Sequence, residues 1–131
     1  MARFEDDRPQ GVIPACLLPF DDDREIDEAA YRDHLRDVAS VAGISAVTVN
    51  AHASEVHACS FAEQDRLLGI TMDEIGARVP VISGIYADGS ARAADLARLA
   101  AGHGAAALLV FPPNSMAMGG QLRPEMALVH F

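Results

Sequence analysis

Short apolar runs alternate with longer amphipathic stretches along this chain of 131 residues. The apolar runs predict strands over residues 11–18, 46–50, 79–83 and 105–111. The stretches between them repeat apolar residues at helical spacing, which predicts helices over residues 27–42, 61–76 and 91–101 and a last helix from about residue 124. Strands and helices that alternate every roughly 25–35 residues, with short loops, are typical of a parallel α/β fold.

The starts of the first two helices have recognisable capping residues. Asp27 is expected to cap the first helix, with Ile26 and Tyr31 as its hydrophobic staple. Ser60 and Glu63 have the spacing of a capping box at the start of the second helix. These signals fix where two of the predicted helices begin.

Other local signals are less regular. Ser90 or Asp88 is expected to cap the third helix, and residues 115–121 are expected to form a loop before Pro124 opens the last helix. Pro14 interrupts the first apolar run, which favours an edge position or irregular strand pairing there. The three consecutive aspartates at residues 21–23 are interpreted as a solvated turn rather than a metal site.

Composition narrows the classes of partner. A net charge of -9 argues against nucleic acid or an anionic membrane surface, and no apolar run approaches the roughly 20 residues that span a bilayer. Residues 1–10 form a polar lead-in that is too acidic for a signal peptide. Without such a signal, Cys16 and Cys59 are interpreted as free, inert thiols in a reducing cytoplasm.

The segment after the second predicted strand concentrates polar side chains. His52, Ser54, Glu55 and His57 follow directly on residues 46–50. In parallel α/β proteins ligands bind at the carboxyl ends of the strands, so residues 51–59 are a candidate binding loop. One hypothesis is that His52 contacts a bound ligand; another is that His52, Glu55 and His57 are metal ligands.

Two further residues follow predicted strands, and one residue type is missing. Asn114 and Tyr86 lie just beyond strand ends, where they would either line a pocket or be ordinary loop residues. All ten basic residues are arginine, so the chain has no lysine.

The ordered set of motifs resembles the dihydrodipicolinate synthase and N-acetylneuraminate lyase family. The motifs are, in order, G-V-I-P-A with a later P-F, I-D at the first helix, S-E after the second strand, E-Q-D-R-L, V-P-V-I-S-G-I-Y-A and L-L-V-F-P-P. The resemblance covers residues 11–131. It implies a TIM-barrel fold and a cytoplasmic, commonly tetrameric enzyme that forms a Schiff base between pyruvate and a lysine and then makes or breaks a carbon–carbon bond.

The chain departs from this family where the chemistry is expected. The family usually has G-T-T-G-E after its second strand, but here Ala51, His52, Ala53, Ser54 and Glu55 stand there, and only Glu55 matches. The usual P-Y-Y after the fourth strand corresponds to residues 112–114, where Asn114 takes the place of a proton-relay tyrosine. In the family the Schiff-base lysine lies on a later strand. Arginine cannot replace it, because a guanidinium stays protonated.

We therefore expect residues 11–131 to form a truncated amino-terminal half of a TIM (β/α)8 barrel, about the first four βα units. The expected function is that of a class I aldolase-like lyase acting on pyruvate or a related 2-keto acid, without a cofactor, in a homo-oligomer when complete. The expected substrate-binding residues are His52, Ala53, Ser54, Glu55 and Asn114, and no catalytic residue or metal ligand is assigned within the chain. The alternatives are a non-catalytic half-barrel that self-associates and a metal-dependent aldolase.

Overall fold

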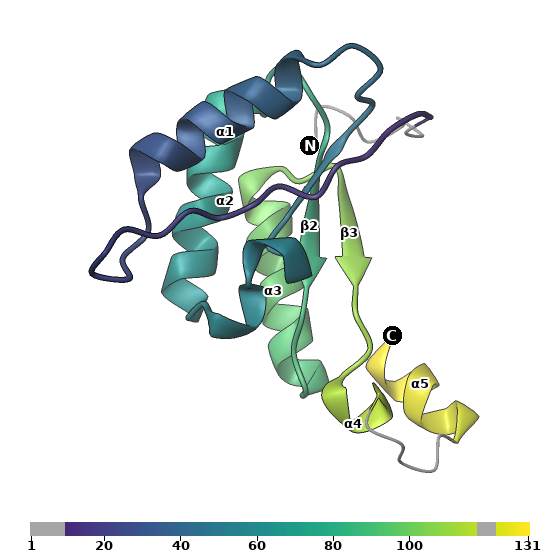
Figure 1. The fold of residues 1–131 in the computed structure, drawn as a ribbon. Helices are drawn as coiled ribbons and strands as arrows, with labels where there is room; N and C mark the ends of the chain where they lie inside the picture. The colour runs from purple at the N-terminus through teal and green to yellow at the C-terminus, as the bar shows by residue number, and fades with distance from the viewer. Residues whose placement is uncertain (1–9, 118–122) are drawn as a thin grey trace.

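A three-stranded parallel sheet forms the centre of the fold. The computed structural model describes residues 10–117 and 123–131. The strands are β1 (Val47–Val49), β2 (Val81–Ile85) and β3 (Ala107–Val110), in the order β1-β2-β3. Both strand pairings are parallel: Val47 of β1 pairs with Val81 of β2, and Ile82 of β2 pairs with Ala107 of β3. The carboxyl ends of the strands therefore lie at the same edge of the sheet (Figure 1). The prediction of an α/β fold with a parallel sheet is confirmed.

The prediction of a continuous strand over residues 11–18 is wrong. Residues 11–18 run beside β1 and the residues before it, and they form only isolated parallel bridges there: Ala15 with Thr48 of β1, and Val12 with Ile44 just before β1. The carbonyl of Pro14 accepts a hydrogen bond from the Thr48 N–H at 2.9 Å. Because Pro14 has no N–H to return, the ladder cannot continue through it, and the expected irregular pairing is what remains.

Three long helices cover one face of this sheet. They are α1 (Glu28–Ser40), α2 (Phe61–Ile75) and α3 (Ser90–His103), and they lie on the same side of the strands in Figure 1. The remaining helices are short: η1 (His52–Ser54), η2 (Val56–Ala58), α4 (Asn114–Ala117) and α5 (Pro124–His130). The helices α4 and α5 lie beyond the carboxyl end of β3 (Figure 1).

The capping predictions hold for the first two long helices. The Asp27 side chain accepts a hydrogen bond from the Ala30 N–H at 2.9 Å. Ser60 and Glu63 form the complete capping box, with the Ser60 N–H donating to the Glu63 carboxylate and the Glu63 N–H donating to the Ser60 hydroxyl. This box fixes the point where the loop of residues 51–59 turns into α2.

The capping prediction for α3 is wrong. Gly89 is the N-cap residue, and no side chain accepts a hydrogen bond there. Asp88 instead accepts a hydrogen bond from the Asn114 N–H at 2.7 Å, so its carboxylate caps the start of α4. A partner 26 positions away leaves no local signal, whereas an Asp-Gly-Ser sequence before a helix is an ordinary capping pattern.

Other boundaries also differ from the sequence prediction. Residues 114–117 form the single turn α4, where a loop was expected from residue 115, and residues 118–121 of that loop lie outside the described residues. The predicted lead-in likewise lies outside them except for Gln10. The strand predicted over residues 79–83 begins two residues later and includes Gly84, which was assigned to the exit loop. Pro124 does begin the last helix, as predicted.

Gly84 is required by the close approach of β2 to the end of β1. A Cβ on Gly84 would clash with the Asn50 carbonyl oxygen and would lie 2.7 Å from the Asn50 carbonyl carbon. Asn50 itself adopts a left-handed backbone with φ 51° and is buried. The carboxyl ends of β1 and β2 are therefore packed backbone against backbone, directly below the candidate loop.

The core lies between the sheet and the three long helices. Its largest fully buried side chains include Tyr31, Leu35, Leu67, Leu68, Ile75 and Ile85. The Tyr31 hydroxyl lies 2.9 Å from the Thr71 hydroxyl, and Thr71 donates to the Leu67 carbonyl. Burial raises the pKa of Tyr31 well above its usual range, so this phenol is a structural group.

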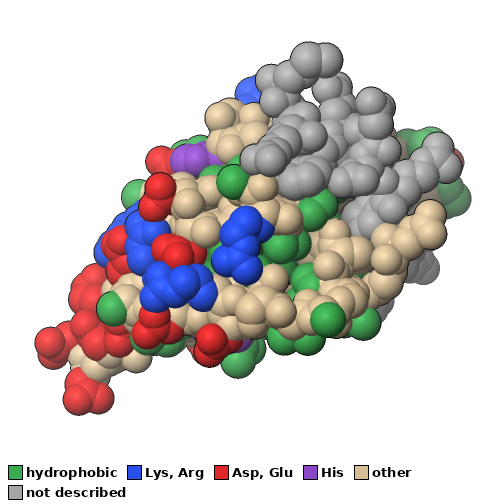
Figure 2. Space-filling view, turned by 90° about the horizontal axis from the view of Figure 1, so that it is seen from above, with side chains coloured by type: hydrophobic (Ala, Val, Ile, Leu, Met, Phe, Trp, Pro, Cys, Tyr) green, Lys and Arg blue, Asp and Glu red, His purple; other side chains and the backbone are tan. Residues whose placement is uncertain are grey.

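Ion pairs connect the outer surfaces of α1 and α2. Arg32 bonds to Glu74 at 2.9 Å and to Asp73 at 2.8 Å, and Arg36 bonds to Glu74 at 2.7 Å. Figure 2 shows such acidic and arginine side chains interleaved on one side of the molecule. The Arg36 and Arg32 guanidinium groups hold the pKa of Glu74 below its ordinary value. In the part of the chain that is described, no helix has the length and apolar character to cross a membrane.

Candidate functional site

The loop of residues 51–59 is held from below by buried groups. The Ser54 hydroxyl donates to the Cys16 carbonyl at 2.8 Å, and Ser54 is 2% exposed. Val56, the first residue of η2, is also buried. The loop backbone is therefore tied to the segment beside β1. The hydrogen of the Ser54 hydroxyl is already used, so any contact of Ser54 with a ligand would employ the oxygen as an acceptor.

Three side chains of the same loop face outward. His52, Glu55 and His57 are exposed, while Ala53 between them is half-buried. Glu55 links η1 to η2 in a left-handed conformation with φ 51°. A non-glycine residue in this region stores backbone strain and is found preferentially at functional sites. The loop is thus a fixed backbone that displays two imidazoles and a carboxylate.

The imidazole of His52 packs into a cluster of rings. His52 and Phe111 are stacked, with ring centroids 4.3 Å apart and ring planes at 26°. Tyr86 meets His52 edge to face at 5.4 Å, and Tyr86 and Phe111 are 6.4 Å apart. Each ring directly follows or closely follows a different strand. We call His52, Tyr86 and Phe111 the ring cluster.

A pair of buried amides lies under the loop. Asn50 donates from Nδ2 to the Gln64 carbonyl at 3.0 Å, and Gln64 donates from Nε2 to the Cys59 carbonyl at 3.2 Å. Both residues are less than a tenth exposed. Among the described residues no partner reaches Asn50 Oδ1 or Gln64 Oε1. These amides brace the two ends of the loop through their N–H groups.

Asn114 lies at the first position of α4, beyond β3. Its backbone N–H is bound by Asp88, and the residue is exposed. The structure therefore brings Asn114 next to the residues that follow β2, at the same edge of the sheet as the loop that follows β1.

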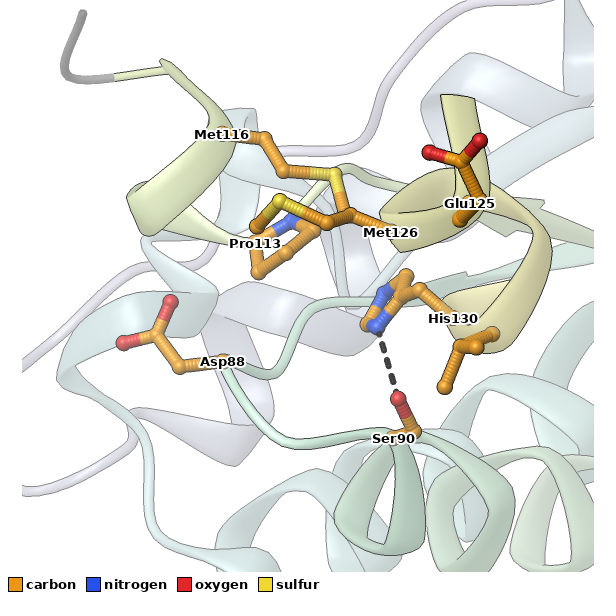
Figure 3. Close-up of a pocket in the computed structure, with 8 residues that line it drawn as sticks. Asp88, Ser90, Pro113, Met116, Glu125, Met126 and His130 are labelled. Atoms are coloured by element: carbon orange, nitrogen blue, oxygen red, sulfur yellow. Dashed lines mark hydrogen bonds between the residues drawn. The ribbon is translucent and has the colours of Figure 1, made fainter. Parts of the chain in front are cut away.

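A cavity of about 410 Å³ lies between the start of α3 and the helices α4 and α5. Pro113, Met116 and Met126 supply apolar walls, and His130 points from α5 toward Ser90, with its Nδ1 3.3 Å from the hydroxyl (Figure 3). The polar lining side chains are Asp88, Ser90, Glu125 and His130. This cavity does not include any residue of the candidate loop.

A second cavity, of about 340 Å³, does include the loop. It is lined by Phe20, Arg24, Glu55, Ala58 and Glu63. Glu55 therefore faces a space different from the ring cluster, and Glu63 is already engaged in the capping box. The sequence grouped His52 and Glu55 as neighbours in one site, whereas the structure directs them to different surroundings.

Cys59 lies in the loop, and Cys16 lies in the segment to which the loop is bound. Neither thiol is in a setting that would make it reactive. Both Cys16 and Cys59 are free thiols. Burial raises the pKa of the Cys16 thiol to about 11. The pKa of Cys59 is also raised, first by burial and then by the nearby carboxylates of Glu63 and Glu55. Both thiols are therefore protonated at neutral pH, which fits their interpretation as packing residues.

The geometry does not favour the metal hypothesis. Over residues 10–117 and 123–131, no three His, Cys, Asp or Glu side chains come together as metal ligands would, and this holds for His52, Glu55 and His57. His52 is occupied by aromatic packing, and Glu55 lines another cavity.

Comparison with known proteins agrees with this fold. The family model for the dihydrodipicolinate synthetase family matches residues 8–117. The chain belongs to the dihydrodipicolinate synthetase family. The match includes the strands β1 to β3, the candidate loop and the residues after β3 up to α4. The resemblance inferred from the ordered motifs is thereby confirmed.

The chain is also similar in sequence to individual members of this family. The chain is 34% identical to the 4-hydroxy-tetrahydrodipicolinate synthase of Xylella fastidiosa over 120 residues, 91% of this chain and 39% of that protein. It is 34% identical to the enzyme of the same name from Methanopyrus kandleri over 105 residues, 79% of this chain and 35% of that protein. The chain thus spans less than two fifths of the length of these relatives.

A solved structure has the same fold. A candidate dihydrodipicolinate synthetase from Pseudomonas aeruginosa superposes with a TM-score of 0.83 over 92% of this chain and 40% of that chain. The identity is 23%, so this likeness concerns the fold alone. The strands and helices of the chain therefore follow the arrangement found in that structure.

Sequence reasoning missed two features of the site. It noted Tyr86 but treated Phe111 as part of a strand, because nothing local indicates that residues 52 and 111 stack. It also did not single out the amides of Asn50 and Gln64. An asparagine at the end of a valine-rich buried strand was the available signal, since a buried amide requires a partner.

Proposed function

We propose that this chain supplies about the first four βα units of a TIM-barrel lyase of the dihydrodipicolinate synthetase family, acting on pyruvate or a related 2-keto acid. The proposal depends chiefly on one observation. A backbone-anchored loop, residues 51–59, follows β1 at the edge of the sheet where parallel α/β enzymes bind ligands. The segment of residues 11–18, bridged to β1, would be the first barrel strand.

Within this loop His52 is the residue proposed to contact the substrate. A ring N–H of His52 would donate to the carboxylate of the 2-keto acid, in place of the threonine hydroxyl usual at this position. Ala53 would leave room beside it, and Ser54 would hold the loop through Cys16. Glu55 would set the left-handed turn that orients the loop, and Asn114 would offer its amide from the end of β3.

The carbon–carbon chemistry would need an amine that this chain lacks. Since all ten basic residues are arginine, no side chain here can form an imine with a keto acid. We therefore propose that the amine is supplied outside residues 1–131, that this chain is inactive alone in that step, and that the complete enzyme is a cytoplasmic homo-oligomer.

Borohydride trapping tests this assignment. The protein as its gene encodes it is incubated with pyruvate, reduced with borohydride, digested and mapped by mass spectrometry. The expected result is a reduced pyruvate adduct on a lysine outside residues 1–131. An adduct on any residue of this chain would contradict the proposal, and so would the absence of any adduct from a protein that does contain a lysine after a barrel strand.

The second candidate function is a non-catalytic half-barrel that acts by self-association. The observation that favours it is the apolar exposure of β3, where Leu108, Leu109 and Val110 are each about 40% exposed. In α5, Leu128 and Val129 are nearly 80% exposed. Exposed apolar strands of this kind invite pairing with another chain. Light scattering after size exclusion would favour this candidate if the 131-residue chain forms a stable dimer, and disfavour it if the chain aggregates or unfolds.

A further inference from the structure

We propose that Phe111 and Tyr86 are positioning residues for His52. In this role their rings hold the imidazole in one orientation over the substrate site without themselves touching the substrate. The inference rests on the proposed function in one respect, which is that His52 contacts the substrate carboxylate. Beyond the proposed function, the inference states that Phe111 and Tyr86 make this contact effective.

The three rings come from three consecutive strand ends. His52 lies in η1 just after β1, Tyr86 directly follows β2, and Phe111 directly follows β3. Because neighbouring parallel strands end at the same edge, residues 52, 86 and 111 converge although the chain separates them widely. The ring cluster therefore lies along the carboxyl edge of the sheet, where it connects the segments that follow β1, β2 and β3.

The three rings are arranged much as favourable aromatic pairs are. Aromatic pairs prefer centroid separations of about 4.5–7 Å in offset-stacked or edge-to-face arrangements. The stacked pair His52 and Phe111 is slightly closer than this range, at 4.3 Å, and the two edge-to-face contacts of Tyr86 lie within it. One face of the imidazole is thereby covered by Phe111, and Tyr86 limits its rotation.

An imidazole needs such support more than a threonine does. The threonine hydroxyl is attached to Cβ, so the backbone alone places it. The ring nitrogens of His52 lie further out, beyond an additional rotatable bond, and His52 is exposed. A side chain that is free to rotate loses entropy when it binds, and prior restraint reduces that loss. The buried Ser54 and Val56 fix the loop backbone but leave the His52 side chain free.

The test separates a positioning role from simple packing. Phe111→Leu keeps an apolar side chain but removes the flat ring, while Phe111→Tyr keeps the ring. Phe61→Leu is the matched control, because Phe61 is also half-buried and its ring lies under the Arg92 guanidinium, away from the ring cluster. Pyruvate dissociation constants are measured by titration calorimetry in the protein as its gene encodes it, alongside NMR spectra of the histidine ring protons.

The expected results follow from the interaction energy of one aromatic pair. Phe111→Leu should raise the pyruvate dissociation constant roughly two- to tenfold. Phe111→Tyr and Phe61→Leu should leave it nearly unchanged. The ring protons of His52, assigned by their disappearance in His52→Gln, should be shifted upfield by stacking in the wild type and in Phe111→Tyr. They should move toward free-histidine positions in Phe111→Leu.

Two outcomes are informative in different ways. If His52→Gln weakens pyruvate binding but Phe111→Leu does not, the positioning role is overturned while the proposed function stands. If His52→Gln leaves binding unchanged, the substrate role of His52 has failed. The positioning role depends on that contact and is then overturned as well, whatever the proton shifts show.

Discussion

Ser54 and Cys16 are joined by a buried hydrogen bond between segments 38 positions apart, in which the Ser54 hydroxyl donates to the Cys16 carbonyl. This bond attaches the candidate loop to the segment that runs beside β1. The loop is therefore part of the folded core on its inner side, and only its outer side is available to a ligand.

Replacing this serine tests how far the loop depends on the bond. Ser54→Ala leaves the Cys16 carbonyl without its donor in a buried setting, which should lower the free energy of unfolding by about 1–3 kcal/mol. Urea denaturation measures this change. The control is Ser40→Ala, whose hydroxyl donates to the Asp37 carbonyl on the exposed end of α1 and whose loss should cost less than about 0.5 kcal/mol. Equal effects of the two substitutions would contradict the anchoring role.

The junction between β1 and β2 predicts a strong response at Gly84. Gly84→Ala places a methyl group against the Asn50 carbonyl, so the strand ends must separate, and the free energy of unfolding should fall by about 3 kcal/mol or more. Gly102→Ala is the matched control in α3, where nothing lies within 4 Å of the added Cβ. That substitution should stabilise the helix by up to about 1 kcal/mol. Thermal unfolding of both variants distinguishes them, and a neutral Gly84→Ala would show that β1 and β2 do not meet as described.

The ion pairs between α1 and α2 predict a pH dependence. The pKa of Glu74 is lowered by its hydrogen bonds to Arg36 and Arg32, from an ordinary value of 4.5. A lowered folded-state pKa contributes stability above the unfolded-state pKa, and this contribution is lost as the pH falls through the folded-state value. Glu74→Gln should therefore be less stable than the wild type at neutral pH, and the difference should shrink as the pH drops below 4.5.

Denaturant midpoints between neutral and acidic pH measure this convergence. Glu125→Gln serves as the control, because no ion pair joins Glu125 to another side chain among residues 10–117 and 123–131. Its difference from the wild type should show no comparable change with pH. A Glu74→Gln deficit that persists unchanged into acid would mean that the carboxylate charge is not what stabilises the pair. Added salt should also narrow the neutral-pH difference, because the groups are partly exposed.

The two cysteines should differ in reactivity toward a thiol reagent. Cys16 is completely buried and its pKa is about 11, whereas Cys59 is half-buried. At neutral pH a disulfide reagent should modify Cys59 slowly and leave Cys16 unmodified until the protein unfolds. Cys59→Ser should remove the native-state reaction. Rapid labelling of Cys16 in the native protein would show that the first segment is not packed against β1 as described.

Local chemistry explains which parts of this structure the sequence could predict. The Asp27 cap and the capping box of Ser60 and Glu63 involve residues at most three positions apart, so their patterns are visible in the sequence. The three strands of the sheet were recognisable as short apolar runs, although β3 is exposed where β1 and β2 are buried. Pro14 indicated an edge position or irregular pairing, because proline has no N–H to donate to a ladder, and isolated bridges are what the structure shows.

The remaining features depend on contacts across the fold. Asp88 was expected to cap α3, but it caps α4 because Asn114 lies beside it in space. The stacking of His52 on Phe111 also depends on the order of the strands, which no local pattern encodes. Glu55 was grouped with His52 by sequence proximity, yet its left-handed backbone directs it to another cavity.

The central claim is that a 2-keto acid binds at the loop of residues 51–59. Its most direct test is a pyruvate titration of the isotope-labelled protein, as its gene encodes it, followed by backbone amide NMR shifts. The account predicts saturable changes that are largest over residues 51–55 and near Asn114, and that weaken in His52→Gln. Changes centred instead on the cavity between Asp88 and His130, or no saturable change at all, would contradict it.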